Sequence, residues 1–235
     1  MRIVVAHSQL NTLGGGERVV LELLRHLSQR HEVMLWAGGY RPQQTYPDLT
    51  AFTRRDLAPI EWLYRVPRAD VVLTHSFGAH LLALRHPVTI CYVHTLRSRY
   101  LRGETRPDLA ARRSLDRLAL RRAAALATNS AFSAGLVARR YSRVAEVIPC
   151  GVTPGLLELS PTPGSYALYV GRVAPEKGIE RLITWSAGLP FDLHIAGAGE
   201  ARYGGQLRAL AGPGLRWLGP LYGDDLARAY AGARN

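Results

Sequence analysis

The sequence predicts an α/β protein of two domains, each built on a parallel sheet of Rossmann-like topology and facing the other across a cleft. Short apolar runs alternate with amphipathic helical patterns from end to end, which is typical of βαβ units. Between two such series, residues 153–165 contain three prolines and two glycines, a composition typical of a linker. We therefore expect domains at 1–152 and 166–235.

In the first domain, the apolar run 2–7 predicts a strand. A helix is expected over 17–29, because Val19, Val20, Leu23, Leu24 and Leu27 recur at helical spacing. Further strands are expected at 32–37, 70–75, 88–94, 126–129 and 144–148, and further helices at 108–125 and 131–140.

The second series predicts strands at 166–171, 191–196 and 215–218 and helices at 178–185, 201–210 and 224–231. A doubly wound domain usually has about five or six strands, so this domain is expected to be incomplete. We accordingly expect the chain to be the front part of a longer protein.

The composition excludes several classes of protein. The chain has 235 residues, 47% of them apolar, so it is neither disordered nor fibrous. No apolar run reaches the ~18 residues that a membrane helix needs. Cys91 and Cys150 are too few for a disulfide framework, and we expect both to be reduced, buried thiols in a cytoplasmic protein. A net charge of +12 indicates an anionic partner.

Lys177 is the only lysine among 30 basic residues, and it lies in the loop 171–178 between a predicted strand and a predicted helix. Arg172 begins the same loop. A planar guanidinium and a compact ammonium together neutralise a diphosphate without a metal. An ordinary surface loop is the alternative, but the position of the single lysine favours phosphate binding.

Two glycine-rich turns follow predicted strands. Gly14, Gly15 and Gly16 precede the first helix, where glycine permits close approach of a ligand to the backbone N–H groups. Their spacing fits neither a dinucleotide fingerprint nor a Walker loop, and a plain turn is the alternative. The second turn, with Gly197 and Gly199, is expected to lie beside the loop 171–178.

Three histidines fall at predicted strand ends, where parallel sheets bind ligands. His94 is the first candidate for a site residue, His75 the second and His7 the third. No cysteine or carboxylate accompanies them, so no metal site is predicted. Asp224 and Asp225 are expected to cap the last helix.

The segment 97–122 contains nine arginines and three acidic residues. A solvated helix face is the usual explanation, and contact with anionic lipid is a second one. A nucleic-acid partner is not predicted, because no nucleic-acid-binding motif or aromatic platform accompanies the arginines.

The ordered series of motifs resembles family 4 glycosyltransferases, the retaining, nucleotide-sugar-dependent enzymes of the GT-B fold, and most closely their mannosyltransferase-type members. The resemblance runs from residue 1 to about 230 and rests on seven segments: 14–18, 70–76, 92–95, 129–132, 147–152, 171–178 and 195–199.

The resemblance implies a role for each motif. Gly15, Gly16, Arg172 and Lys177 would bind the donor diphosphate, and His94 would lie near the transferred sugar as the catalytic residue. The turn with Gly197 and Gly199 would lie near the base and ribose, and His75 is a further candidate for the site.

The resemblance also implies the partners. These are a GDP- or UDP-sugar as the donor, with mannose as one candidate sugar, and a glycan or a lipid-linked molecule as the acceptor. The resemblance implies no cofactor and no metal. It also implies peripheral contact of the protein with the inner face of the membrane. The glutamate motif of the family, two glutamates eight positions apart, is not found after Gly171. A non-catalytic nucleotide- or partner-binding remnant is therefore the first alternative function, and a basic membrane- or nucleic-acid-binding protein is the weaker one.

Overall fold

The computed structural model describes residues 1–53, 68–76, 78–94, 108–151 and 164–234, and the side chains of 108–112 lie outside the description. These residues form two compact units, Met1–Cys150 and Gly151–Asn235. Each unit contains one sheet, and every strand pair in both sheets is parallel. Most of the predicted linker 153–165 lies outside the described residues.

The first unit is built on a six-stranded sheet of order β2-β1-β3-β4-β5-β6. Its strands are β1 (Arg2–His7), β2 (Glu32–Ala37), β3 (Val71–Thr74), β4 (Thr89–Val93), β5 (Ala125–Thr128) and β6 (Glu146–Val147). Its helices are α1 (Gly15–Ser28), α3 (Asp108–Arg122) and α4 (Ala131–Tyr141), with 3-10 turns η1 (Pro42–Gln44), η2 (Pro47–Phe52) and η3 (Ala79–Leu84).

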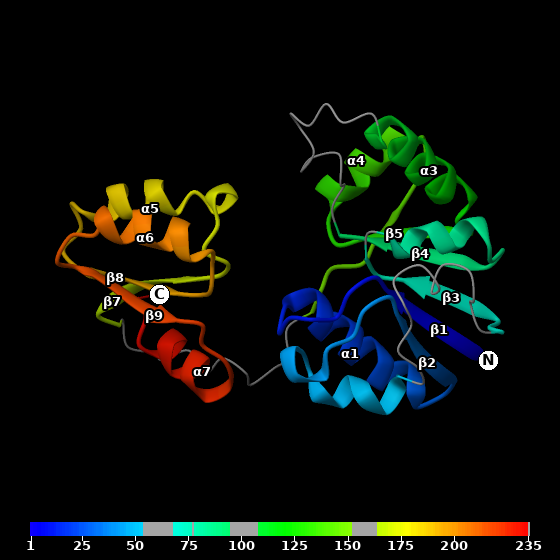
Figure 1. Ribbon diagram of the computed structural model, residues 1–235, viewed down its shortest axis with the longest axis horizontal. Helices are drawn as coiled ribbons and strands as arrows, with labels where there is room; N and C mark the ends of the chain where they lie inside the picture. Colours follow the sequence, from blue (N-terminus) through cyan, green and yellow to red (C-terminus); the bar gives the residue numbers. More distant parts are fainter. Residues whose placement is uncertain (54–67, 77, 95–107, 152–163, 235) are drawn as a thin grey trace. The chain divides into compact units, whose positions relative to one another are not determined.

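Both faces of this sheet are covered, because alternate side chains of β1 enter different cores. Ile3 and Val5 pack with Leu24 of α1, whereas Val4 and Ala6 pack with Leu82 of η3. The helices α3 and α4 add a third cluster around β4 and β5. In Figure 1, α1 accordingly lies on one side of the sheet and α3 and α4 on the other.

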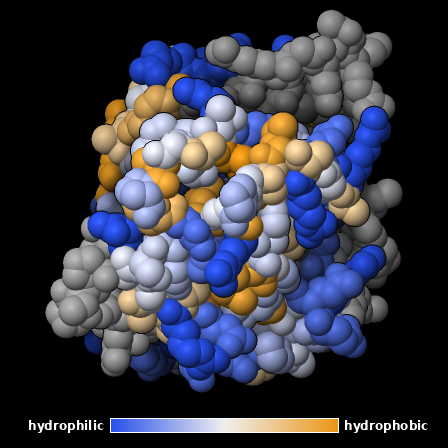
Figure 2. Space-filling model, turned by 90° about the vertical axis from the view of Figure 1, so that its left-hand side faces the viewer, coloured by the Kyte–Doolittle hydropathy of each residue, from blue (hydrophilic) through white to orange (hydrophobic). Residues whose placement is uncertain are grey.

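The second unit has a three-stranded sheet of order β7-β8-β9. Its strands are β7 (Tyr166–Val170), β8 (Asp192–Ala196) and β9 (Leu215–Gly219), and its helical elements are η5 (Pro175–Lys177), α5 (Ile179–Ser186), α6 (Ala201–Ala209) and α7 (Gly223–Ala231). Ile183, Ile195 and Leu207 pack in one core between the sheet and the pair α5 and α6, and α7 lies on the opposite face (Figure 1). Figure 2 shows that apolar residues come to the surface of the side it views in patches separated by hydrophilic ones.

The predicted strands and helices are confirmed, with ends that differ by at most a few residues. The helix of the first domain begins at Gly15 and not at Glu17, so two of the three glycines lie inside it. The prediction for Asp224 and Asp225 is wrong: Tyr222 is the N-cap of α7, and both carboxylates lie in its first turn, where they interact favourably with the helix dipole.

The prediction that both cysteines are buried is right for Cys91 and wrong for Cys150. Both thiols are free, but Cys150 is exposed, because β6 ends at Val147 and the chain has left the sheet before it reaches Cys150. No helix in the described part of the chain is long and apolar enough to span a membrane.

Candidate functional site

The three histidines singled out in the sequence come together at the carboxyl edge of the first sheet. His7 ends β1, His75 follows β3 and His94 follows β4, and these strands are neighbours in the sheet. The ring centroids of His75 and His94 lie 4.4 Å apart, and those of His7 and His75 lie 6.3 Å apart. The parallel register therefore places three imidazoles from distant parts of the sequence in one cluster.

Polar and stacking contacts hold the cluster. Nε2 of His94 lies 3.2 Å from both ring nitrogens of His75. The ring of Tyr92 stacks on His75 at 5.0 Å with an interplanar angle of 10°. The Tyr92 hydroxyl donates to the carbonyl of Ile148 at 2.6 Å, and the Ser133 hydroxyl donates to the carbonyl of His94 at 3.5 Å.

Burial keeps the cluster uncharged at neutral pH. Burial, with a smaller contribution from repulsion by nearby imidazoles, lowers the pKa of His7 to about 4 and that of His75 to about 3. Burial also lowers the pKa of His94 below its ordinary value. Neutral imidazoles carry one N–H donor and one acceptor each, so the cluster offers hydrogen bonds to a ligand without a net charge.

Tyr92 and Ser133 were not identified as site residues from the sequence. The sequence could have identified Tyr92, because residues i and i+2 of a strand point to the same face of the sheet. Tyr92 therefore lies on the same face as His94. Ser133 is brought to the site by α4, whose N-cap Ser130 accepts a hydrogen bond from the Ser133 N–H at 3.3 Å.

The glycines 14–16 form the start of α1, with Gly14 as its N-cap. The Glu17 carboxylate folds back toward Gly14 and accepts a hydrogen bond of 2.5 Å from the Thr12 hydroxyl. A Cβ on Gly14 would lie 2.5 Å from Glu17 Oε2, so a larger residue here would require the Glu17 side chain to shift.

Gly15 and Gly16 differ from Gly14. A Cβ on either would meet no atom of the described chain within 4 Å, and neither has a positive φ. Neither internal packing nor backbone conformation therefore requires glycine at these two positions. Both positions leave open space beside the first helical turn, whose N–H groups favour an anion.

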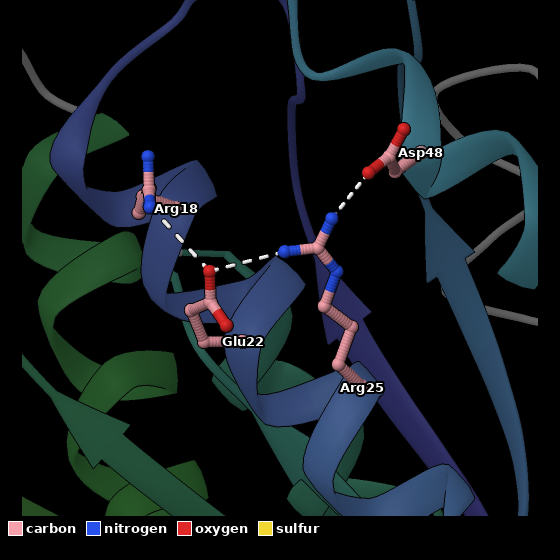
Figure 3. A network of polar contacts seen from close by, with 4 residues as sticks. All are labelled: Arg18, Glu22, Arg25 and Asp48. Atoms are coloured by element: carbon pink, nitrogen blue, oxygen red, sulfur yellow. Dashed lines mark hydrogen bonds and ion pairs between the residues drawn. The ribbon is translucent and has the colours of Figure 1, made fainter. Parts of the chain in front are cut away.

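Ion pairs form a network on α1, the helix that begins at this turn (Figure 3). Glu22 Oε1 lies 3.5 Å from Arg18 Nε and 3.3 Å from Arg25 Nη1, and Arg25 also contacts Asp48 of η2. Arg25 thus links the helix to η2, which packs on the same face of the sheet through Leu49.

In the second unit, the two cations predicted to bind phosphate lie on one exposed loop after β7. Arg172 Nη2 lies 3.0 Å from Glu176 Oε1, and the hydroxyl of Tyr169 donates to the backbone carbonyl of Arg172 at 2.9 Å. Lys177 ends the turn η5 and forms no ion pair with any described residue. The sequence did not identify Tyr169 or Glu176 as neighbours of Arg172.

The turn with Gly197 and Gly199 lies beside this loop, as predicted. The Gly171 N–H donates to the carbonyl of Ala196 at 3.0 Å, and the Val173 N–H donates to the carbonyl of Ala198 at 2.8 Å. A Cβ on Gly197 would lie 1.8 Å from the carbonyl oxygen of Gly171, and one on Gly199 would lie 2.1 Å from that of Val173. Both glycines are therefore required by the contact between two backbone segments, whatever ligand they bind.

The candidate residues form two separate groups. Gly15, Gly16, His75 and His94 belong to the first unit, and the phosphate-binding and nucleotide-binding candidates belong to the second. Among the residues that the structure describes, no three His, Cys, Asp or Glu side chains gather so that they could hold a metal ion.

Comparison with known proteins identifies the kind of protein to which these sites belong. Residues 13–156 match the profile of Glycosyltransferase Family 4. A search of curated proteins returned no match.

Solved structures with the same fold include three glycosyltransferase-type proteins. HepE of Anabaena, in complex with UDP and glucose, has a TM-score of 0.70 at 18% identity, over 94% of this chain and 70% of HepE. WaaG, a glycosyltransferase involved in lipopolysaccharide biosynthesis, has a TM-score of 0.67 at 15% identity, over 98% of this chain and 73% of WaaG.

The lipopolysaccharide outer core galactosyltransferase WaaB has a TM-score of 0.63 at 16% identity, over 94% of this chain and 68% of WaaB. The predicted GT-B fold, with a parallel sheet in each part, is thereby confirmed.

Proposed function

The chain belongs to Glycosyltransferase Family 4, and we propose that it moves a sugar from a nucleoside diphosphate sugar to a hydroxyl acceptor with retention of configuration. A UDP-sugar or a GDP-sugar is the proposed donor, mannose is one candidate sugar, and a glycan or lipid-linked molecule is the proposed acceptor. The fold neighbour HepE was crystallised with UDP, which favours testing uridine nucleotides first.

The exposed cations Arg172 and Lys177 on one loop carry the proposal. When the bond between the sugar and the diphosphate breaks, negative charge develops on the leaving phosphate oxygens. Cations placed beside those oxygens stabilise the charge and lower the barrier. The N–H groups of Gly15 and Gly16 are proposed to bind the same diphosphate, because their open space admits a phosphate group at a helix N-terminus.

His94 is proposed to lie beside the transferred sugar. In the proposed reaction, the acceptor oxygen forms a bond to the anomeric carbon on the face that the diphosphate leaves, and the hydroxyl proton passes to the leaving phosphate. A neutral His94 offers the sugar a hydrogen bond without binding the diphosphate as a counter-ion. Gly197 and Gly199 are proposed to lie near the base and ribose.

These roles assign a task to each part of the chain. Residues 1–152 are proposed as the acceptor-side domain and residues 166–235 as the nucleotide-sugar domain, with a linker at 153–165.

A binding experiment tests the diphosphate site. Calorimetry would compare UDP with uridine for the wild type, Arg172→Ala and Lys177→Ala. Each variant loses a charge-assisted contact of about 1.5–3 kcal/mol, so UDP binding should weaken at least tenfold while uridine binding is little changed. Arg181→Ala, an exposed arginine on the neighbouring helix α5, is the matched control and should bind UDP like the wild type. Equal UDP affinity in all four proteins would reject the assignment.

A transfer assay separates an enzyme from a nucleotide-binding remnant. Release of UDP or GDP from a panel of nucleotide sugars, with and without sugar acceptors, reports turnover. Nucleotide binding without any release of nucleoside diphosphate would favour the remnant.

Contact with anionic lipid is a second proposed property, favoured by the described part of α3. Four arginines are exposed there: Arg113, Arg117, Arg121 and Arg122. Between them in the sequence lie two leucines, Leu115 and Leu118, whose exposed fractions are 46% and 44%. Arginines beside exposed leucines match the chemistry of a lipid headgroup region.

Vesicle binding tests this second property. Reversal of the four arginines to glutamate should release the protein from vesicles that contain phosphatidylglycerol, and added salt should weaken the wild-type binding. Reversal of Arg181 and Arg202 in the second unit is the matched control. Undiminished binding after reversal on α3 would show that these arginines only face solvent.

A further inference from the structure

The closest polar contact of His94 within the histidine cluster is with His75. Nε2 of His94 lies 3.2 Å from both ring nitrogens of His75, and the two ring planes meet at an angle of 76°. His75 is 3% exposed, whereas His94 is only partly buried. The contact therefore joins an interior side chain to one that a ligand can reach.

The fold holds His75 on several sides. Its backbone N–H donates to the carbonyl of Ala6 at 3.0 Å, which extends the pairing of β3 with β1. Tyr92 stacks on one side of the ring, and His7 lies stacked at 6.3 Å. With the ring held in this way, its nitrogen atoms have a fixed direction, and they present a fixed partner to His94.

A neutral imidazole is a donor at one ring nitrogen and an acceptor at the other, and the partner of one nitrogen decides which is which. We propose that His75 is a positioning residue, which fixes the ring orientation and the tautomer of His94 through its contact with Nε2. Nδ1 of His94 is then either a donor or an acceptor, and not a mixture of the two, toward the sugar or the acceptor hydroxyl. This proposal rests on the proposed function of His94.

Two observations support the proposal. Burial lowers the pKa of both histidines, so both are neutral at pH 7 and tautomer selection can operate. Among the described residues, which do not include 95–107, His94 Nδ1 also has no hydrogen-bond partner.

Two variants separate the hydrogen bond of His75 from its packing. His75→Phe keeps an aromatic ring between Tyr92 and His7 but removes both nitrogens. His75→Gln loses the ring and keeps a polar group. His194→Phe is the matched control, because His194 also lies in a strand and its ring also stacks on a tyrosine, Tyr166, but it belongs to the second unit and not to the histidine cluster.

The first measurement does not depend on activity. Nitrogen-15 NMR of the imidazoles would report the tautomer of His94 at pH 7. We expect one tautomer in the wild type and in His194→Phe, and a mixture in His75→Phe, with partial recovery in His75→Gln. Identical His94 nitrogen shifts in the wild type and His75→Phe would overturn the proposal even if no sugar transfer were detected.

The second measurement uses turnover. With transfer established for the wild type, His75→Phe should lower kcat about tenfold, which corresponds to ~1.4 kcal/mol of barrier, and leave the KM for the donor unchanged. His194→Phe should retain its kcat. A His75→Phe enzyme with full kcat, or with a loss confined to KM, would overturn the positioning role. Absence of transfer in the wild type would instead contradict the proposed function, and the NMR result would still decide the tautomer.

Discussion

The substitution Gly16→Ala separates ligand binding from folding. The added methyl group would meet no described atom within 4 Å, and the backbone at Gly16 does not have a positive φ. Alanine is also the better helix former, by up to ~1 kcal/mol in a helix interior. The variant should therefore be as stable as the wild type or slightly more stable.

The same methyl group would occupy the open space in front of the first turn of α1. If a diphosphate lies there, as proposed, its oxygen atoms lose their close approach to the backbone N–H groups. We expect the Kd for UDP to rise at least tenfold, or ~1.4 kcal/mol.

Two assays on the same samples measure the two effects. Thermal unfolding should show an unchanged or higher Tm, by at most about 2–4 °C for 1 kcal/mol in a chain of this size. Calorimetry should show the loss of UDP affinity. Gly205→Ala is the control, because Gly205 lies in α6 and its added Cβ would also meet nothing within 4 Å. It should gain stability and bind UDP normally.

Two results would refute the reasoning. Unchanged UDP affinity in Gly16→Ala would mean that no phosphate approaches this turn. A large loss of stability would mean that the open space around Gly16 is filled in the folded protein.

Further predictions concern the histidines, the thiols and the second glycine turn. In the folded protein the pKa of His7 is about 4 and that of His75 is about 3, both below the ordinary 6.5, so the unfolded chain binds more protons than the folded chain as the pH falls below 6.5. Urea unfolding should therefore show that the free energy of unfolding falls by about 2 kcal/mol for each histidine between pH 7.5 and pH 5. Equal stability at both pH values would contradict this prediction. Iodoacetamide should modify exposed Cys150 in the native protein and spare buried Cys91, whose thiol pKa is raised to about 11 by burial; mass spectrometry that finds both labelled at equal rates would contradict it. Gly197→Ala should lower the Tm of the second unit, because its Cβ overlaps a backbone carbonyl oxygen, and an unchanged Tm would show that the two loops separate easily.

The regular elements of the fold could be predicted because their signals are local. The apolar run 2–7 and the helical spacing after Gly16 each reflect burial in the core of the first unit, and both elements are found. The 3-10 turns were missed, because segments such as Pro47–Phe52 have no helical period and owe their place to the burial of Leu49.

The candidate site could be predicted only in part. Strand ends are visible in the sequence, so His75 and His94 could be placed at one edge of the sheet. Their contact depends on the register between β3 and β4, which pairs Thr74 with Cys91 and which no local pattern reveals. The pairing of Arg172 with Glu176 was missed for a different reason. Residues four apart are neighbours on a helix, whereas this pair spans a loop and a 3-10 turn, where sequence spacing does not predict a contact.

The pairing of the segments after β7 and β8 has a consequence for protein engineering. Hydrogen bonds at Gly171 and Val173 continue the strand pairing beyond the ends of both strands, and the bridge between Val173 and Gly199 extends it further. An insertion in either segment would shift this register and bring a side chain against a carbonyl group. The two loops therefore form one exchangeable cassette: grafting from a relative should succeed when both loops are transferred together, and should fail when only one is replaced.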